Sequence, residues 1–237
     1  MSTLTLLLAG PLQSWGAAAR FSRRTTEPAP TKSAVVGLLA SAQGIQRGDD
    51  EGLRPLSALR FGVRIDQPGT RLRDFQTAID WETEKSMPLS ERFYLADAVF
   101  VAAVEGPPAL LADLHQALRT PAYPPFLGRR SCPPARPLEL GLHPDKDLLQ
   151  ALRHEPWQAS PHHTKKHTGH SAVKLPVLYE ATDHTTDTDT LRDQPVSFAA
   201  EHRRHALRTI VRTDVELPTT ATPPRHDPFD ALPEESR

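Results

Sequence analysis

A tryptophan lies in a short loop after the first apolar segment of the chain. The loop Gln13-Ser14-Trp15-Gly16 is followed by a basic stretch that includes Arg20 and Arg24. An aromatic ring can stack an unpaired base while arginine side chains bind the phosphates of a single strand. The alternative is a tryptophan that packs on the core, with the arginines in water. The sequence alone leaves both interpretations open.

The start of a predicted helix is a second candidate, because Thr31 and Ser33 flank Lys32 there. The first turn of a helix has free N–H groups and a partial positive charge, so it can bind a phosphate. The GxxxxGK spacing of a phosphate-binding loop is absent. An ordinary capped helix with a solvated lysine is the alternative, and position alone favours it.

A third candidate is the loop Gly128-Arg129-Arg130-Ser131, which prolines flank on both sides. Two adjacent guanidinium groups on a stiff loop would bind backbone phosphates with little ordering cost. No Asp or Glu occurs between Asp113 and Glu139. This local lack of acid favours an anionic partner.

Residues 71–92 combine basic side chains such as Arg73 with carboxylates such as Asp74 and Glu82. We predict a protruding hairpin or loop here. Mixed charge fits a protein contact or a hairpin that reaches over a neighbour as well as it fits a solvated loop.

Four histidines, at positions 162, 163, 167 and 170, invite a zinc site. Lys165 and Lys166 would repel a cation, and no Cys or acid completes a ligand set. Pro161 and Gly169 also disrupt helical spacing. We therefore predict a flexible His-rich loop, no metal site and no cofactor.

Apolar patterns predict the elements that position these residues. Strands are expected at about 4–9, 59–66, 98–104 and 138–142, with amphipathic helices at about 33–45 and 110–118. The order β-α-β-(insert)-β-α-β is typical of an α+β, ferredoxin-like or RRM-type palm with helices on one face of the sheet.

The predicted organisation has three parts. Residues 1–142 form the palm and include a thumb hairpin at about 71–95. Residues 143–217 form a less regular, β-rich C-terminal part packed on the palm, with strands at 172–180 and 207–215. Residues 218–237 are rich in Pro, Thr and acid, so we expect a disordered tail.

Composition narrows the class of protein. The 237 residues carry 28 Lys+Arg and 29 Asp+Glu, and 38% are hydrophobic, which is enough for a core. No apolar run approaches the roughly 20 residues that span a bilayer. Cys132 is the single cysteine, which excludes an internal disulfide and a CxxC metal site. We expect a cytoplasmic protein without membrane contact.

Catalytic signals are weak. The GxSxG and HExxH motifs are absent. A metal-free ribonuclease needs a general base beside the 2′-OH that attacks, and no residue stands out for that role. We therefore expect no enzymatic activity and no catalytic residue.

The segments above together resemble the CasD family, a subunit of the type I-E CRISPR surveillance complex Cascade. The two most specific blocks are GPLQSWG at 10–16 and PFLGRRSCP at 125–133. The resemblance covers nearly all of residues 3–142 and is looser up to about 215. Supporting blocks are Pro30-Thr31-Lys32-Ser33 with Gly37-Leu38-Leu39, Leu59-Arg60-Phe61-Gly62-Val63-Arg64, and Arg73-Asp74-Phe75-Gln76-Thr77.

The resemblance implies a palm of the RAMP superfamily (the RAMP fold) with a hairpin thumb. It implies a non-catalytic subunit that caps the 5′ handle of the guide RNA (crRNA) and contacts the large subunit and the adjacent backbone subunit of Cascade. Target DNA would be contacted only indirectly, through the complex. The candidate RNA-binding residues are Gln13, Ser14, Trp15, Gly16, Arg20, Arg24, Thr31, Lys32, Ser33, Arg73, Arg129, Arg130 and Ser131.

Two departures from the family pattern and two alternatives remain. The thumb is short and carries Gln76 where family members often have histidine, and the His-rich segment and the tail have no evident counterpart.

One alternative is a metal-independent endoribonuclease that processes CRISPR repeat RNA. The other is a protein adaptor that does not contact RNA.

Overall fold

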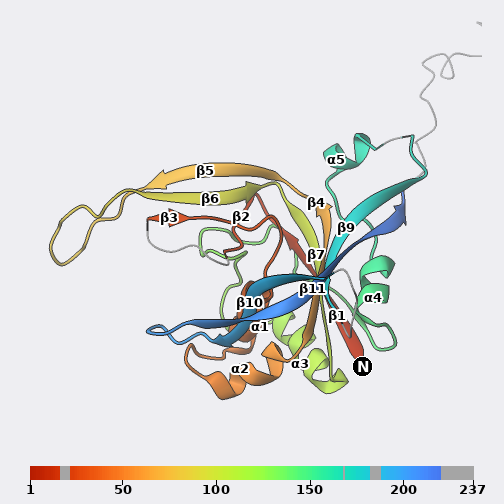
Figure 1. Ribbon diagram of the computed structural model, residues 1–237, viewed down its shortest axis with the longest axis horizontal. Coiled ribbons are helices and arrows are strands. Elements are labelled where there is room, and N and C mark those ends of the chain that lie inside the picture. The colour runs from red at the N-terminus through yellow and green to blue at the C-terminus, as the bar shows by residue number, and fades with distance from the viewer. Residues whose placement is uncertain (17–21, 168, 182–187, 220–237) are drawn as a thin grey trace, which may run out of the picture.

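The computed structural model describes residues 1–16, 22–167, 169–181 and 188–219. Its main element is a curled, antiparallel sheet of seven strands in the order β10-β11-β9-β4-β7-β1-β8 (Figure 1). The strands are β1 (Ser2–Ala9), β4 (Arg60–Gln67), β7 (Val99–Gly106), β8 (Glu139–His143), β9 (Ala172–Glu180), β10 (Asp189–Ser197) and β11 (Arg204–Pro218).

The palm is the part of this sheet with the order β4-β7-β1-β8, in which all neighbouring strands are antiparallel. Helix α1 (Lys32–Gln43) precedes β4, and helix α3 (Pro108–Arg119) connects β7 to β8. This strand order and these crossovers are those of a ferredoxin-like fold, so the predicted α+β fold class is confirmed.

Both faces of the palm sheet are covered, which explains the continuous apolar runs in β1 and β7. On β7, Phe100 and Val104 belong to the core on the side of α1 and α3, whereas Val101 and Ala103 belong to a second core. Helix α4 (Leu148–His154) closes that second core. The helices of the palm itself thus lie on one face of the sheet, as expected, and α4 from the C-terminal part covers the other face.

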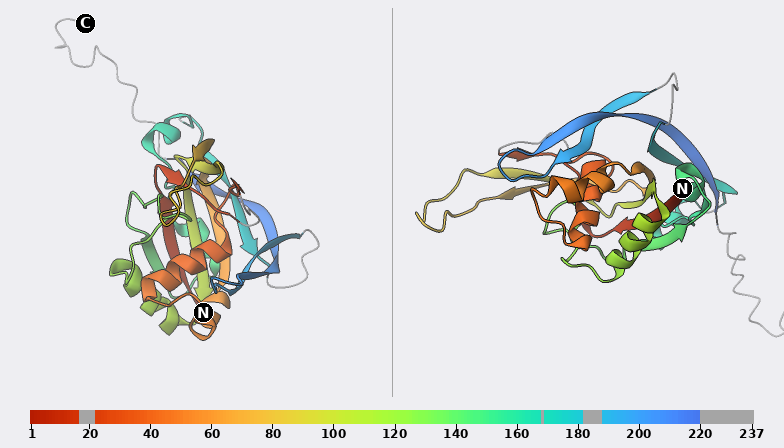
Figure 2. Two further views of the ribbon diagram at one scale, coloured as in Figure 1. Left: turned by 90° about the vertical axis from the view of Figure 1, so that its left-hand side faces the viewer. Right: turned by 90° about the horizontal axis from the view of Figure 1, so that it is seen from below.

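The C-terminal part continues the palm sheet. Strand β9 pairs with β4, and β11 and β10 follow it outward. The sheet curls so far that β10 packs against α1 and α2 (Asp50–Ser57) (Figure 2). The predicted strand at 172–180 matches β9, and β11 extends beyond the predicted 207–215. Strand β10 was not predicted, because its sequence contains Pro195 and its pairing is interrupted by register shifts.

A second, small sheet carries the thumb. Strands β5 (Thr70–Gln76) and β6 (Ser90–Ala96) form a hairpin that projects from the palm (Figure 1). Strand β2 (Leu12–Gln13) pairs with the end of β6 next to the palm, and β3 (Arg23–Arg24) pairs in parallel with residues 91–92, nearer the hairpin tip. The protruding hairpin expected at about 71–95 is thus present. Because β2 and β3 flank the tryptophan loop, the thumb and that loop are joined through one sheet.

The His-rich segment is not simply a loop. Residues Pro161–Lys165 form helix α5, with Ser160 as its N-cap: the Ser160 hydroxyl accepts a hydrogen bond from the His163 N–H. Pro161 begins this helix instead of disrupting it, because proline is favoured in the first helical turn, where its missing N–H costs no hydrogen bond. His167 and His170 lie beyond the end of the helix.

The structure describes only the first residues of the tail that we expected at 218–237. Residues 220–237 of the expected tail lie outside the described part of the chain, whereas Pro218 is the last residue of β11. Among the described residues, none of the helices combines the length and the apolar character that crossing a bilayer would require.

Candidate nucleic-acid interface

The tryptophan loop and the double-arginine loop lie against each other. The Ser14 N–H donates to the carbonyl of Leu127 at 3.1 Å. Gly128 has φ 85°, and a Cβ atom added to it would lie 1.8 Å from the Ser14 carbonyl oxygen. Only glycine permits this approach of the two backbones, so Gly128 determines how closely the loops can pack.

A groove of about 860 Å³ lies between these loops, α1 and the connection from β10 to β11. Four of the predicted binding residues line it: Ser14, Gly16, Ser33 and Arg130. Gly128, in the same loop as Arg130, also contributes to the lining. The groove is large enough for a few nucleotides, since ligand pockets commonly measure 300–1,000 Å³.

Charged residues that sequence analysis missed also line the groove. Arg47, Arg203 and His205 contribute to it, as do Asp49 and Asp50. The basic run His202-Arg203-Arg204-His205 is visible in the sequence. It was not assigned to a site because β10, the strand that brings it close to α1, was not predicted. Burial, and next the charge of Arg203, lower the pKa of His205, which favours its neutral form.

Trp15 cannot stack a base in this structure. Its side chain is 0% exposed and belongs to the main core, and its indole N–H donates to Gln13 Oε1 at 3.2 Å. The Gln13 amide in turn donates to the carbonyls of Leu8 and Ala98. The expected contacts of these two side chains with RNA are therefore corrected: both are buried and shape the loop that carries Ser14 and Gly16.

The helix start at Thr31–Ser33 is also corrected, because a carboxylate of the same chain occupies it. The Lys32 backbone N–H donates to Asp193 Oδ2 at 2.7 Å. Asp193 lies on β10 and also accepts two hydrogen bonds from Arg208, at 2.6 and 2.9 Å. The free N–H group and positive end of α1 that a phosphate would use are thus already neutralised.

The Lys32 side chain is 3% exposed and forms an ion pair with Glu180 at 2.8 Å. Burial lowers its pKa, and the interaction with Glu180 opposes that shift. Thr31 is fully buried, and of these three residues only Ser33 lines the groove. Lys32 is therefore a buried structural charge and not an accessible phosphate ligand.

We expect Lys32→Met to destabilise the chain by about 1–3 kcal/mol, because Glu180 loses its closest ion-pair partner and keeps only Arg208 at 3.7 Å. The affinity for single-stranded RNA should stay unchanged, since the ammonium group does not face the groove. Urea unfolding and RNA binding of the same preparation would measure the two effects. A loss of RNA affinity at unchanged stability would restore Lys32 as a phosphate ligand.

The two adjacent arginines have different environments. The Arg129 guanidinium lies over the ring of Tyr94 at 4.7 Å and donates to the carbonyl of Arg24 at 2.9 Å. Its Nη1 atom is buried without a hydrogen-bond partner. Arg130 and Ser131 are exposed, and Arg130 lines the groove. Arg129 thus connects the loop to the small sheet, whereas Arg130 is accessible to an anion.

The remaining predicted residues lie on or near the thumb sheet. The Arg73 side chain pairs with Glu91 at 2.6 Å and lies over the ring of Phe75. The Arg24 side chain is exposed on β3, and Arg20 lies outside the described residues. The sheet also carries Arg23 and Arg71 on either side of Phe93, so basic side chains continue from the loops onto the thumb.

Neither a metal ligand set nor a base paired with a nucleophile lines the groove. The part of the chain that the structure describes holds no group of three His, Cys, Asp or Glu residues placed to bind a metal. Thr5, His143 and Glu155 do contact one another, with the Glu155 carboxylate 2.8 Å from His143 Nε2. They lie between β1, β8 and the end of α4, and none of the three lines the groove.

Comparison with known proteins identifies the family of this chain. The family model described as CRISPR-associated protein (Cas_Cas5) matches residues 3–211. The chain belongs to this Cas5 family. A curated relative, "CRISPR system Cascade subunit CasD" of Escherichia coli (strain K12), is 37% identical over 188 residues, which cover 71% of this chain and 84% of that protein. The resemblance to the CasD family is thereby confirmed.

Solved structures agree with this assignment. A chain of a "CRISPR RNA-guided surveillance complex" superposes on the Cas5-family chain with a TM-score of 0.72 at 33% identity, covering 94% of this chain and 95% of the other. A second structure, "Crystal structure of Cas protein", gives a TM-score of 0.65 at 35% identity, covering 93% and 97%. The similarity thus extends through the C-terminal strands as well as the palm.

Proposed function

We propose that this chain is a non-catalytic, crRNA-binding subunit of a type I-E Cascade complex, which caps the 5′ handle of the guide RNA. In this role it would also join the large subunit of the complex to the backbone subunits. The observation that carries the proposal is the groove, because it collects the two family-specific loops, the first turn of α1 and three arginines around one space.

The chemistry of the groove suits a single strand with unpaired bases. Arg47, Arg130 and Arg203 offer guanidinium groups to phosphates, and Ser14 and Ser33 offer hydroxyl groups to base edges or to a 2′-OH. Aromatic rings of Phe126 and Phe198 are also part of the lining. In this proposal they take the stacking role that the buried Trp15 cannot perform.

The thumb supports the proposed contact with a neighbouring subunit. Its tip exposes large apolar side chains, including Trp81 at 90% and Ile79 at 72% exposure. Phe75, Met87 and Leu89 along the same hairpin are at least half exposed. A protruding hairpin with this much apolar surface is typical of a protein contact rather than of a solvated loop.

The test is the double variant Arg129→Ala/Arg130→Ala in the full-length chain. We expect the affinity for handle RNA to fall by about tenfold, because two charge-assisted contacts or their support are lost. The slope of log K against log salt should decrease by about 0.7, the value for one lost phosphate contact to a single strand, because of the two arginines only Arg130 lines the groove. Fluorescence anisotropy across a salt titration would measure both quantities.

The control is Arg119→Ala/Arg153→Ala, which removes two exposed arginines from α3 and α4. It should bind handle RNA like the parent chain. Equal affinity of the two double variants at every salt concentration would refute the placement of the handle in this groove. Gel analysis of the same RNA tests the non-catalytic role, since metal-independent cleavage that His205→Ala abolishes would assign an endoribonuclease instead.

A further inference from the structure

A basic segment that the proposed function does not use lies far from the groove. Residues 156–179 contain no Asp or Glu, and His162, Lys165, Lys166 and His170 are all exposed. The helix α5 lies at the opposite end of the molecule from α2, which borders the groove (Figures 1 and 2). The segment therefore forms a second cationic surface, distinct from the proposed RNA site.

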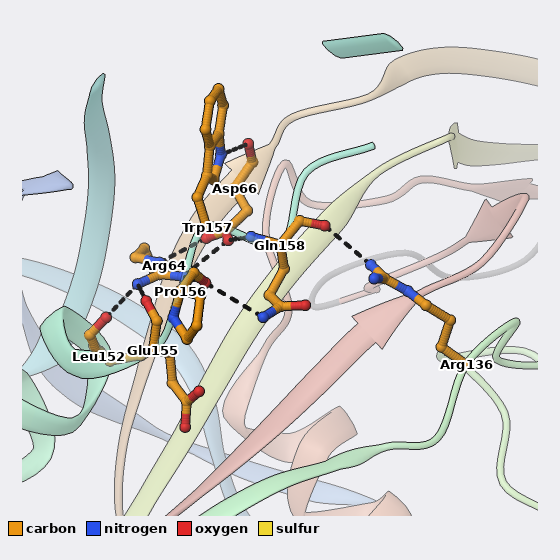
Figure 3. A network of polar contacts seen from close by, with 8 residues as sticks. All are labelled: Arg64, Asp66, Arg136, Leu152, Glu155, Pro156, Trp157 and Gln158. Carbon is orange, nitrogen blue, oxygen red and sulfur yellow. Dashed lines mark hydrogen bonds and ion pairs between the residues drawn. The ribbon is translucent and has the colours of Figure 1, made fainter. Parts of the chain in front are cut away.

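A buried ion pair positions the polypeptide that leads into this segment (Figure 3). Arg64 on β4 is 0% exposed and binds Asp66 at 2.6 Å and 2.9 Å. The same guanidinium donates to the carbonyls of Leu152, Glu155 and Pro156. Residues 152–156 are thus held by hydrogen bonds to one buried side chain.

Further contacts continue this anchoring up to α5. Asp66 accepts the Gln158 N–H at 2.6 Å and, through its carbonyl, the Trp157 indole N–H at 2.9 Å. The Gln67 side chain accepts hydrogen bonds from both the N–H and the hydroxyl of Ser160, the N-cap of α5. Gln158 also brings in Arg136, which donates to its carbonyl (Figure 3). The basic helix is therefore displayed on a specific support.

The aromatic side of the segment faces inward. The Trp157 ring is half-buried and meets the rings of His163 and His167 edge to face, at 6.0 and 5.3 Å between centroids. Burial, followed by the charges of the neighbouring His and Lys side chains, lowers the pKa of His163. The inward side is thus packed through aromatic rings, and the outward side presents cationic or titratable groups.

This arrangement suits a nucleic acid whose bases are not available for stacking. A surface that reads single strands combines basic groups with exposed aromatic rings. A surface that binds a duplex through its phosphates needs only the basic groups. We propose that His162, Lys165, Lys166 and His170, with Arg136, form a surface that binds the phosphate backbone of double-stranded DNA without regard to sequence. This goes beyond the proposed function, in which DNA is contacted only through the complex.

The test compares Lys165→Gln/Lys166→Gln with Arg54→Gln/Arg119→Gln in the full-length chain. Both variants remove two exposed cationic side chains, but the second pair lies on α2 and α3. A fluorescent DNA duplex without any target sequence serves as the probe. We expect the first variant to bind it about tenfold more weakly and with a salt slope lower by about 1.8, at roughly 0.9 for each lost phosphate contact. The control should bind like the parent chain.

Two further measurements make the outcome specific. Thermal unfolding midpoints of the two variants should agree with that of the parent chain, because the replaced side chains are exposed. Handle RNA should bind the lysine variant with unchanged affinity, because the replaced lysines do not line the groove. Duplex binding equal to that of the control would overturn the proposal. If the duplex affinity is unchanged but another subunit is lost from the assembled complex, the proposal is also overturned. That result would assign the surface to a protein partner.

Discussion

Replacement of Arg64 by methionine is expected to destabilise the chain by about 3–5 kcal/mol, as is typical when a buried ion pair loses one partner. The Asp66 side chain is 1% exposed and would retain the Gln158 N–H as its hydrogen-bond donor from the protein. Burial already raises the pKa of Asp66, and Arg64 opposes that shift. Without Arg64 the carboxyl group would be driven further toward its neutral form.

The loss extends beyond the ion pair, because the carbonyls of Leu152, Glu155 and Pro156 also lose the guanidinium as a donor, and Pro156 keeps only the Gln158 amide at 3.4 Å. Unsatisfied buried acceptors are expensive since they have given up water without gaining a partner. Relative to the parent chain, amide hydrogen exchange should therefore accelerate more in residues 155–160 than in the palm strands. Urea unfolding followed by circular dichroism measures the total effect.

The double variant Arg64→Met/Asp66→Asn separates the charge from the packing. Removing the negative charge as well should recover part of the lost stability, so the two single effects should not add. A single Arg64→Met variant within about 1 kcal/mol of the parent chain would contradict the assigned role, because such a cost is ordinary for a surface substitution. The result would also remove the support inferred for α5.

Gly128→Ala is expected to have the second large effect, a loss of about 3 kcal/mol or more in unfolding free energy. Two causes combine at this position. Its φ of 85° disfavours any residue with a side chain, and the new Cβ would lie 1.8 Å from the Ser14 carbonyl oxygen. Backbone atoms cannot move aside as a flexible side chain can, so the two loops must separate.

Gly48→Ala is the matched control for this variant. Gly48 has a similar φ of 93°, but nothing lies within 4 Å of a Cβ added there. Its cost should be confined to about 1–2 kcal/mol for the left-handed backbone conformation. The difference between the two variants in urea unfolding therefore isolates the contact between the loops.

Handle RNA binding gives an independent readout for Gly128→Ala. If the loops separate, Ser14 and Arg130 no longer face one groove, and RNA affinity should fall even where the variant remains folded. A variant as stable as Gly48→Ala, with the RNA affinity of the parent chain, would show that loop contact is neither tight nor needed for binding.

Local patterns in the sequence were sufficient to predict the palm. Apolar and polar residues alternate along residues 59–66, and apolar residues run continuously near 4–9 and 98–104. Both patterns reflect the burial of side chains along a single strand, so they are visible in the sequence itself. The two loops were also identified, because Gly10-Pro11, Gly128 and Pro133 mark turns whose geometry is local. The order of the predicted strands and helices indicated the fold class, and the charged insert between two strands indicated the protruding hairpin.

The tertiary structure decided which polar side chains are accessible. Lys32 and the N-terminus of α1 are neutralised by Glu180 and Asp193, which are supplied by strands more than a hundred residues later in the chain. Trp15 is buried because the core formed by β1, β7 and α1 encloses it. Sequence composition determines that such groups exist, but their exposure depends on which distant strand pairs beside them and on how strongly the sheet curls, and neither is encoded in local spacing.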